Sequence, residues 1–284
     1  MTIRNIFVPL FSGVPFAAQL EATADLALRI NAHINVVFTR PDSVIAAAAV
    51  PEMIAAAGVV SEAIEIEGKR AQIAAFEEFD RWRTAYGFLP AENDTAENTV
   101  AAWHERVGAV ASTVVDIGRL CDLAVIAKPD SYEIVTEEAF AAAVFEAGCP
   151  TLVTPARVPQ SLFHHVIIAW NDSLQAARAL HGAMPIIRQA ERVSIFAPLE
   201  DAKTRSQSPS LLEHLSWHGV NAERLEIEGK VHDVGKALLD GAAESHATMI
   251  VMGAYSHSRI REAVLGGVTR HVLRHADIPV LMAH

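Results

Sequence analysis

Residues 248–270 have the sequence TMIVMGAYSHSRIREAVLGGVTR. The apolar run from Thr248 to Met252 predicts a buried strand, and Gly253 follows it at once. The pair Gly266–Gly267 then precedes a stretch with helical spacing, Val268 to His275. Glycine lets the backbone approach an anion, and the free N–H groups at a helix start favour negative charge. This order predicts a phosphate-binding loop; the alternative is an ordinary strand–helix turn in which glycine only relieves strain.

The rest of the chain alternates short apolar runs with amphipathic stretches, which is the pattern of alternating strands and helices. Helices are expected at 16–31, 59–86, 109–120, 137–147, 174–189, 210–218, 234–246 and 268–275. Strands are expected at 6–10, 34–38, 100–107, 123–127, 151–153, 165–170, 192–197, 224–227, 249–252 and 279–282. Gly68 lowers the helical propensity of the second helix. Near-continuous apolar strands between helices indicate parallel sheets covered on both faces.

The order of these elements occurs twice. The segment Asp122–Ile126 resembles Thr248–Met252, and Cys149–Val153 resembles Ile278–Met282. We therefore expect an α/β protein with two tandem, doubly wound, Rossmann-like sheets of five parallel strands each. The expected units are residues 1–156, which carry an inserted segment at 42–60, and residues 163–284. The insertion forms a lid or a small apolar pocket, or it is a loop and short helix packed on the surface.

Composition excludes several partners. The chain has 284 residues and a formal net charge of −11, which argues against a nucleic-acid or an anionic membrane surface. The apolar stretch from Val44 to Val60 is interrupted by Pro51 and Glu52, so it is too broken to span a bilayer. Two cysteines in or beside apolar segments, Cys121 and Cys149, indicate buried free thiols. With no secretory signal visible, we expect a cytoplasmic protein.

The loop of the second unit resembles that of the universal stress protein family. The family pattern is Gly, two residues, Gly, nine residues, then Gly followed by Ser or Thr. This chain has Gly253, then Ser256 in place of the second glycine, and Gly266–Gly267 after nine more residues. The flanking Ser258–Arg259 and Ile278–Val280 are also typical of the family. The resemblance covers both halves and implies a tandem universal stress protein with adenine nucleotide alpha hydrolase-like sheets.

The resemblance implies ATP as the ligand of the second unit, with or without magnesium. Asn171 takes the position of an aspartate near the ribose and can hydrogen-bond a sugar hydroxyl. Trp170 fits core packing better than base stacking. Ser256 and Gly267 are departures that remove a glycine and a side-chain donor from the loop. The implied binding residues are Trp170, Asn171, Pro198, Met252, Gly253, Tyr255, Ser256, His257, Gly266, Gly267, Val268 and Thr269.

The first unit lacks this chemistry. Phe11 stands at the position of Asn171, and Ala127 and Asp130 stand at those of Gly253 and Ser256. Counting back from the shared proline, Glu137–Glu138 match Gly266–Gly267. Carboxylates there would repel phosphates in a poorly solvated pocket. We therefore expect no nucleotide phosphate in the first unit.

No pattern of catalytic or metal-binding residues emerges. His271 and His275 have helical i, i+4 spacing without a third ligand nearby, so no metal site is expected. His257 is either a phosphate contact or a solvent-facing loop residue. No Walker lysine follows the glycines, so the chain is at most a slow ATPase. The alternative to an ATP-binding stress-response regulator is a scaffold for a protein or another small ligand, with a vestigial loop.

Single-domain relatives in the family often pair through their last strands. By that resemblance, Thr151–Val153 and Val280–Met282 are expected to pair within one chain and to form an internal pseudo-dimer. The sequence leaves open whether such chains form a homodimer, and it does not identify a regulatory protein partner.

Overall fold

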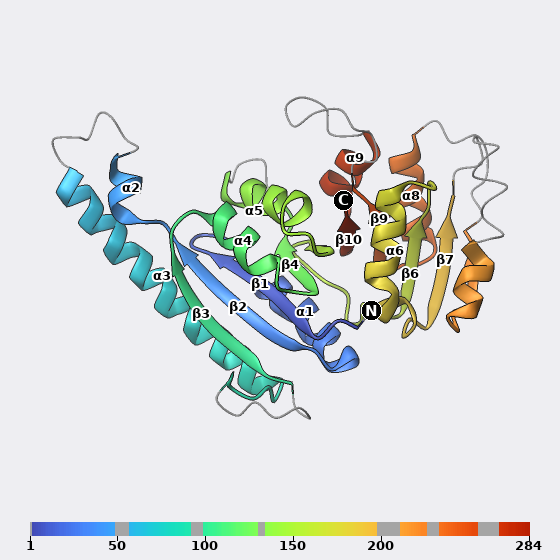
Figure 1. Ribbon diagram of the computed structural model, residues 1–284, viewed down its shortest axis with the longest axis horizontal. Coiled ribbons are helices and arrows are strands. Elements are labelled where there is room, and N and C mark those ends of the chain that lie inside the picture. Colours follow the sequence, from blue (N-terminus) through green and yellow to red (C-terminus); the bar gives the residue numbers. More distant parts are fainter. Residues whose placement is uncertain are drawn as a thin grey trace.

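The computed structural model describes residues 2–48, 57–91, 99–129, 134–197, 211–225, 233–254 and 267–284, and all structural statements below refer to these. The described strands form one sheet in the order β3-β2-β1-β4-β5-β10-β9-β6-β7-β8 (Figure 1). The α/β class with a mostly parallel sheet is therefore confirmed, and the two sets of five strands are joined edge to edge. In these ranges no helix is long and apolar enough to cross a membrane.

The elements of the first half are β1 (Asn5–Phe11), α1 (Ala17–Ile30), β2 (His33–Arg40), α2 (Ser43–Ala48), α3 (Ala57–Ala85), β3 (Ala101–Val107), α4 (Val110–Gly118), β4 (Leu123–Ala127), α5 (Ile134–Phe145) and β5 (Thr151–Thr154). Those of the second half are β6 (His165–Ala169), α6 (Leu174–Ile187), β7 (Arg192–Phe196), a helix at 211–217, β8 (Ala222–Arg224), α8 (Val234–Glu244), β9 (Met249–Gly253), α9 (Gly267–His275) and β10 (Val280–Ala283). Each half has the same strand order around its first strand.

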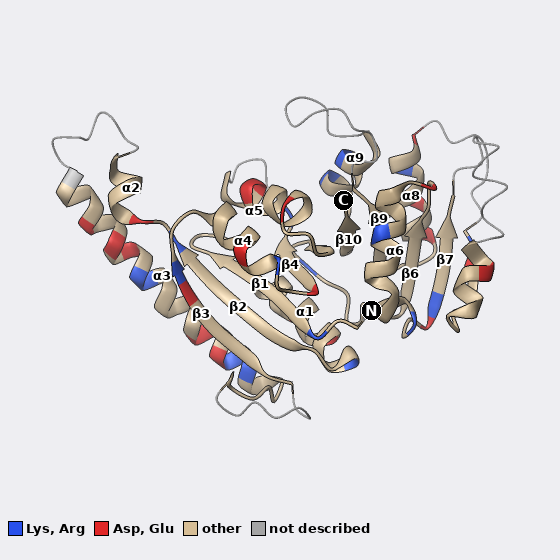
Figure 2. Ribbon diagram, viewed as in Figure 1, with Lys and Arg blue, Asp and Glu red and all other residues tan. Residues whose placement is uncertain are grey.

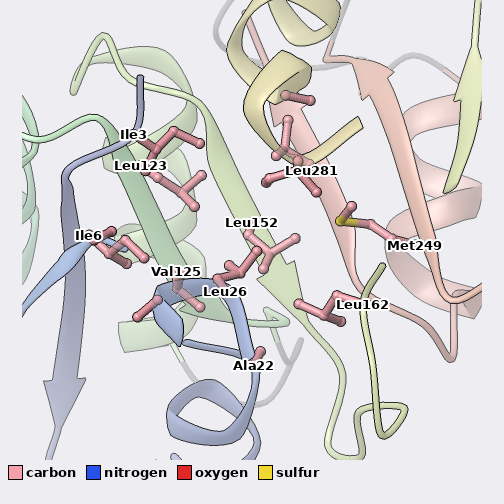
Figure 3. Close-up of a cluster of buried hydrophobic side chains, with 14 of the residues drawn as sticks. Ile3, Ile6, Ala22, Leu26, Leu123, Val125, Leu152, Leu162, Met249 and Leu281 are labelled. Carbon is pink, nitrogen blue, oxygen red and sulfur yellow. The ribbon is translucent and has the colours of Figure 1, made fainter. Parts of the chain in front are cut away.

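The two halves meet at β5 and β10, the pair of neighbouring strands that run antiparallel. Leu152 lies opposite Leu281 in this register, and both side chains are fully buried. Figure 3 shows them between Leu123 of the first half and Met249 of the second. Because one buried apolar cluster includes residues of both halves, the halves share a core as well as a sheet.

Contacts outside the sheet also join the halves. The carboxylate of Asp25 on α1 accepts a hydrogen bond of 2.6 Å from the backbone N–H of Leu162, and burial raises the pKa of this carboxyl group. A Cβ atom on Gly182 of α6 would lie 2.3 Å from Cγ of Pro150. Glycine is therefore required there, because α6 passes directly over the start of β5.

Helix α3 is continuous through Gly68, contrary to the weakness expected there. The side chain of Arg40 crosses the helix at this glycine, with its Cδ atom 3.6 Å from the place where a Cβ would lie. Arg40 then pairs with Glu65 at 2.6 Å. A Cβ at this position would meet Arg40 at an ordinary van der Waals distance, so the contact does not require glycine. The tertiary packing around the helix compensates for the low helical propensity of Gly68.

The last strand before α8 starts earlier in the chain than expected. The sequence placed it at 224–227, whereas β8 covers Ala222–Arg224 and pairs with β7 from Val193 onward. Residues 226–227 lie outside the described ranges. β8 is an edge strand, and two of its residues are charged and exposed. The apolar residues on which the prediction rested therefore lie at the end of the strand and not at its centre.

A buried histidine lies at the amino end of β6. The Nδ1 atom of His165 lies 3.0 Å from the carbonyl oxygen of Ser245, and its Nε2 atom lies 2.8 Å from the hydroxyl of Ser194. A neutral ring with its proton on Nδ1 donates to the carbonyl and accepts from the serine. Burial lowers the pKa of His165, since the charged ring would be poorly solvated.

With His165 replaced by Gln, the protein should lose less unfolding free energy when the pH falls into the mildly acid range. In the unfolded chain the imidazole takes up a proton as pH falls through its ordinary value, near 6.5, while the folded chain resists protonation. Native His165 therefore favours unfolding below that pH and has no such effect well above it. We expect the difference in unfolding free energy between pH 7.5 and 5 to be smaller for the variant, measured by urea denaturation.

His164→Gln is the control, because His164 is the exposed neighbour and pairs with Glu191. An unchanged pH dependence for His165→Gln would contradict the assignment of a buried neutral ring.

Candidate functional site

The candidate site lies where the strand order reverses in the second half. β6 lies between β7 and β9. The chain continues from β6 to β7 and β8 on one side of it and then returns to β9 on the other side. In doubly wound folds the carboxyl ends of strands at such a point form the ligand crevice. The turn after β6, the end of β9 and the first turn of α9 therefore surround the expected site.

The turn after β6 is held by its own side chains. The hydroxyl of Ser173 accepts from the N–H of Ala176 at 3.1 Å, which caps the start of α6. The same hydroxyl donates to Oδ1 of Asn171 at 2.7 Å, and the N–H of Ser173 donates to that oxygen at 3.3 Å. Asp172 has φ = 58° between them. Oδ1 of Asn171 thus stabilises the turn, a role that the sequence analysis did not foresee.

Gly253 at the end of β9 has a steric reason to be glycine. A Cβ atom there would lie 2.5 Å from the backbone nitrogen of Ala176 and 2.7 Å from the carbonyl carbon of Gln175. The first turn of α6 therefore passes directly over the end of β9. This packing accounts for the glycine whether or not a phosphate binds, and a pattern in sequence alone does not separate the two causes.

The remaining predicted site residues divide into three groups. Trp170 is half-buried and packs against the core, with its Nε1 atom buried and without a hydrogen-bond partner, in keeping with the expected packing role. Met252 and Thr269 are buried, Val268 is half-buried and Gly267 is exposed at the start of α9. Five predicted residues lie outside the described ranges: Pro198, Tyr255, Ser256, His257 and Gly266.

Contacts from elsewhere fix the two elements that flank the site. Lys128, which follows β4 of the first half, donates from Nζ to the carbonyl oxygens of Arg274 at 2.9 Å and Ala276 at 3.0 Å. It caps the carboxyl end of α9, and burial lowers its pKa. The ring of His284 donates from Nδ1 to the carbonyl of Ala254 at 3.0 Å and holds the turn after β9.

In the first half a buried glutamine bridges the two corresponding strands, β1 and β4. The register pairs β1 with β4 at Ile6 and Phe7, whereas β6 pairs with β9 as far as Ala169. The side-chain amide of Gln19, which is buried, donates to the carbonyl of Pro9 at 3.3 Å and to that of Val125 at 3.2 Å. Gln19 therefore fills the point where the two strands diverge. The sequence analysis missed it because a glutamine on a helix gives no signal of its tertiary partners.

Acidic residues start the helix that would face a phosphate in the first half. Glu137 lies in the first turn of α5, and Glu138 follows it; both side chains are exposed. Their carboxylates already complement the positive end of that helix. Asp130 lies outside the described ranges. The expectation that the first unit takes no phosphate thus gains a steric argument from Gln19 beside the electrostatic one.

Histidines lie close together at two places among the described residues. The ring of His214 has its centroid 6.1 Å from that of His181 and 4.6 Å from that of His218. The rings of His271 and His275 on α9 have centroids 4.6 Å apart, as their helical spacing requires. Among the residues that the structure describes, no group of three or more His, Cys, Asp or Glu could hold a metal ion.

The strand order and the helices between the strands define a doubly wound α/β protein. Residues 163–284 match the model of the universal stress protein family. The C-terminal half of the chain is therefore similar to this family. A universal stress protein of Synechocystis sp. is 40% identical over 58 residues, which is 20% of this chain and 20% of that relative. The chain thus spans about a fifth of the length of this curated relative.

Solved structures show the fold over nearly the whole chain. A universal stress protein from Archaeoglobus fulgidus is 16% identical, covers 99% of this chain and 96% of its own, and has a TM-score of 0.72. A functionally unknown protein from Pseudomonas aeruginosa PAO1 is 14% identical, covers 98% of this chain and 92% of its own, and has a TM-score of 0.59. At these identities the comparison supports the fold alone.

Gly253→Ala should destabilise the protein by about 2–3 kcal/mol, because its methyl group would overlap the backbone of α6. Gly267→Ala is the matched control, since a Cβ there meets no atom within 4 Å. We expect the control to keep or slightly raise stability, as alanine favours helices by up to about 1 kcal/mol. Thermal and urea unfolding of both variants measure the difference. Equal stabilities would remove the steric explanation for Gly253.

Proposed function

We propose that the C-terminal unit binds ATP at the carboxyl ends of β6 and β9 and acts as a nucleotide-dependent regulator in the stress response. The observation that carries this proposal is the exposed backbone at Gly267 in α9. Gly267 is the first residue of α9 that the structure describes, it is exposed, and no described atom lies within 4 Å of the place where a Cβ would be. A phosphate can approach the backbone closely at such a glycine.

The surroundings suit an adenine nucleotide. Asn171 follows β6 on the neighbouring strand end and offers amide groups to a sugar hydroxyl. Ala197 follows β7 directly and gives an apolar edge on which a base can rest. Lys128 caps the far end of α9, so the helix keeps its place when its amino end takes up an anion. We further infer that residues 1–156 are a degenerate copy that binds no nucleotide.

A second candidate function is a scaffold for a protein or for a different small ligand, with a vestigial loop. The observation that favours it is Gly253, whose presence helix packing explains without any phosphate. The family pattern also has glycine where this chain has Ser256. Slow ATP hydrolysis is the third candidate. It requires phosphate release above a control without protein, because no Walker lysine follows the loop.

Isothermal titration with ATP and magnesium tests the proposal, with Gly267→Glu and Gly267→Ala as the pair of variants. The glutamate copies the acidic start of α5 and places a carboxylate where the phosphates are expected. We expect at least a tenfold loss of affinity for Gly267→Glu and near-native affinity for Gly267→Ala. If millimolar ATP gave no heat, the scaffold function would be favoured instead. If both variants bound ATP with equal affinity, the phosphates would not lie near Gly267.

The same titration gives the number of sites. Gln19 occupies the crevice of the first half, so we expect about one nucleotide per chain. A stoichiometry near two would show that the amide of Gln19 moves aside and would overturn the assignment of a closed first site.

A further inference from the structure

Helix α3 carries a row of apolar side chains on the face that turns away from the protein. Val59, Ile66 and Ile73 are 73%, 46% and 59% exposed. They follow each other at intervals of seven residues, so they form one line along the helix. We call these three residues the α3 stripe. The opposite face of α3, with Phe79 and Trp82, is buried against β2 and β3.

The apolar surface extends beyond the stripe. Helix α2 packs against the first turns of α3, where the hydroxyl of Ser61 donates to that of Ser43 at 3.2 Å. Val44 and Ile45 of α2 are both largely exposed. Figure 1 shows α2 and α3 together at the outer edge of the sheet, far from the crevice at β6 and β9. Neither proposed function uses this surface, and rows of exposed aliphatic residues mark interaction sites.

We propose that the α3 stripe is the surface on which a second copy of this chain docks its own α3 in antiparallel orientation, with the two-fold axis at Ile66. Each residue of one helix then faces the residue that lies equally far on the other side of Ile66. Val59 faces the partner's Ile73, and Ile66 faces the partner's Ile66. The three apolar positions therefore cover each other completely in this register.

The charges beside the stripe fit the same register. Figure 2 shows blocks of acidic and basic residues following one another along the ribbon of α3. Glu62 and Arg70 lie equally far from Ile66, so the antiparallel pair brings Glu62 of each copy to the partner's Arg70. Arg70 has a neighbour within its own chain, Glu67, but their atoms are 3.9 Å apart and both side chains are about three-quarters exposed. Such an exposed ion pair contributes little free energy, so it does not prevent Arg70 from pairing with Glu62 of a second copy.

A parallel pair would be disfavoured by the same residues. It would place Glu62 against the partner's Glu62 and Lys69 against the partner's Lys69 at the centre of the contact. Like charges at such positions repel and set the orientation of paired helices. The sequence of α3 therefore selects the antiparallel arrangement.

A groove beside the stripe offers further contact. It has a volume of about 500 Å³ and is lined by Arg40, Lys69, Gln72, Ile73, Glu105 and Val107. Because the partner's Val59 faces Ile73, its side chain lies next to this groove and to the exposed Val107. The overlap from Val59 to Ile73 covers about four helical turns. It buries on the order of 1,000 Å² in total, which is the size of a weak dimer of roughly micromolar affinity or weaker.

Sedimentation equilibrium of the full chain tests the proposal with a charge-swap series. Glu62→Arg places arginine against arginine in both contacts, and Arg70→Glu places glutamate against glutamate. We expect each single variant to self-associate at least tenfold more weakly than the native chain. The double variant Glu62→Arg/Arg70→Glu restores opposite charges and should dimerise again. An equimolar mixture of the two single variants should form a heterodimer, because both contacts in it are then attractive.

Disulfide cross-linking gives an independent measurement of the register. Ile66→Cys places two thiols on the two-fold axis, and Glu67→Cys places them off the stripe as the control. The native thiols Cys121 and Cys149 interfere little, since burial raises their pKa values to about 12 and about 11. We expect fast cross-linking at residue 66 and slow cross-linking at residue 67.

Three results would overturn the proposal. The native chain could stay monomeric at about 500 μM, the double charge variant could fail to recover, or the two cysteine variants could cross-link equally fast. Because α3 is exposed at every substituted position, circular dichroism should show native folding for the whole series.

Discussion

The antiparallel contact between β5 and β10 is the constraint on which the rest of the structure depends. Each half alone would end in an unpaired strand whose buried face needs cover. Joining them lets Leu152 and Leu281 pack together and makes one continuous core. It also brings Lys128 of the first half to the end of α9 in the second. The first half therefore supports the position of α9 through a contact that the second half cannot make for itself.

Glycines in this chain have causes that differ from place to place. Gly182 and Gly253 are required because α6 approaches Pro150 at one point and crosses the end of β9 at another. Gly68 lies against the side chain of Arg40 at an ordinary van der Waals distance, so packing does not require glycine there. A Cβ on Gly267 would have no described neighbour within 4 Å. Steric packing therefore explains Gly253 but not Gly267, although the sequence motif gives both equal weight.

The sequence predicts what local pattern determines and misses what tertiary contacts determine. Runs of apolar residues located every described strand, because buried parallel strands are apolar on both faces. The pattern placed β8 too late, since an edge strand needs little apolar surface. Gln19 and Lys128 were missed because each has a partner more than 100 residues away in the chain, Val125 for Gln19 and Arg274 for Lys128. Acidic residues in place of the glycines were visible from the sequence, since they replace a motif at known spacing.

The two halves have diverged in opposite directions from one plan. In the first, the amide of Gln19 bridges β1 and β4, and Glu137 lies in the first turn of α5. The same half carries a helix of 29 residues at the outer edge of the sheet, with an apolar stripe that its own core does not use. The second half exposes Gly267 in α9 and lacks such a helix in its described residues. Under the two proposals above, one copy serves association while the other takes the ligand. The shared core matters for this arrangement, because it joins the two halves into one packed structure.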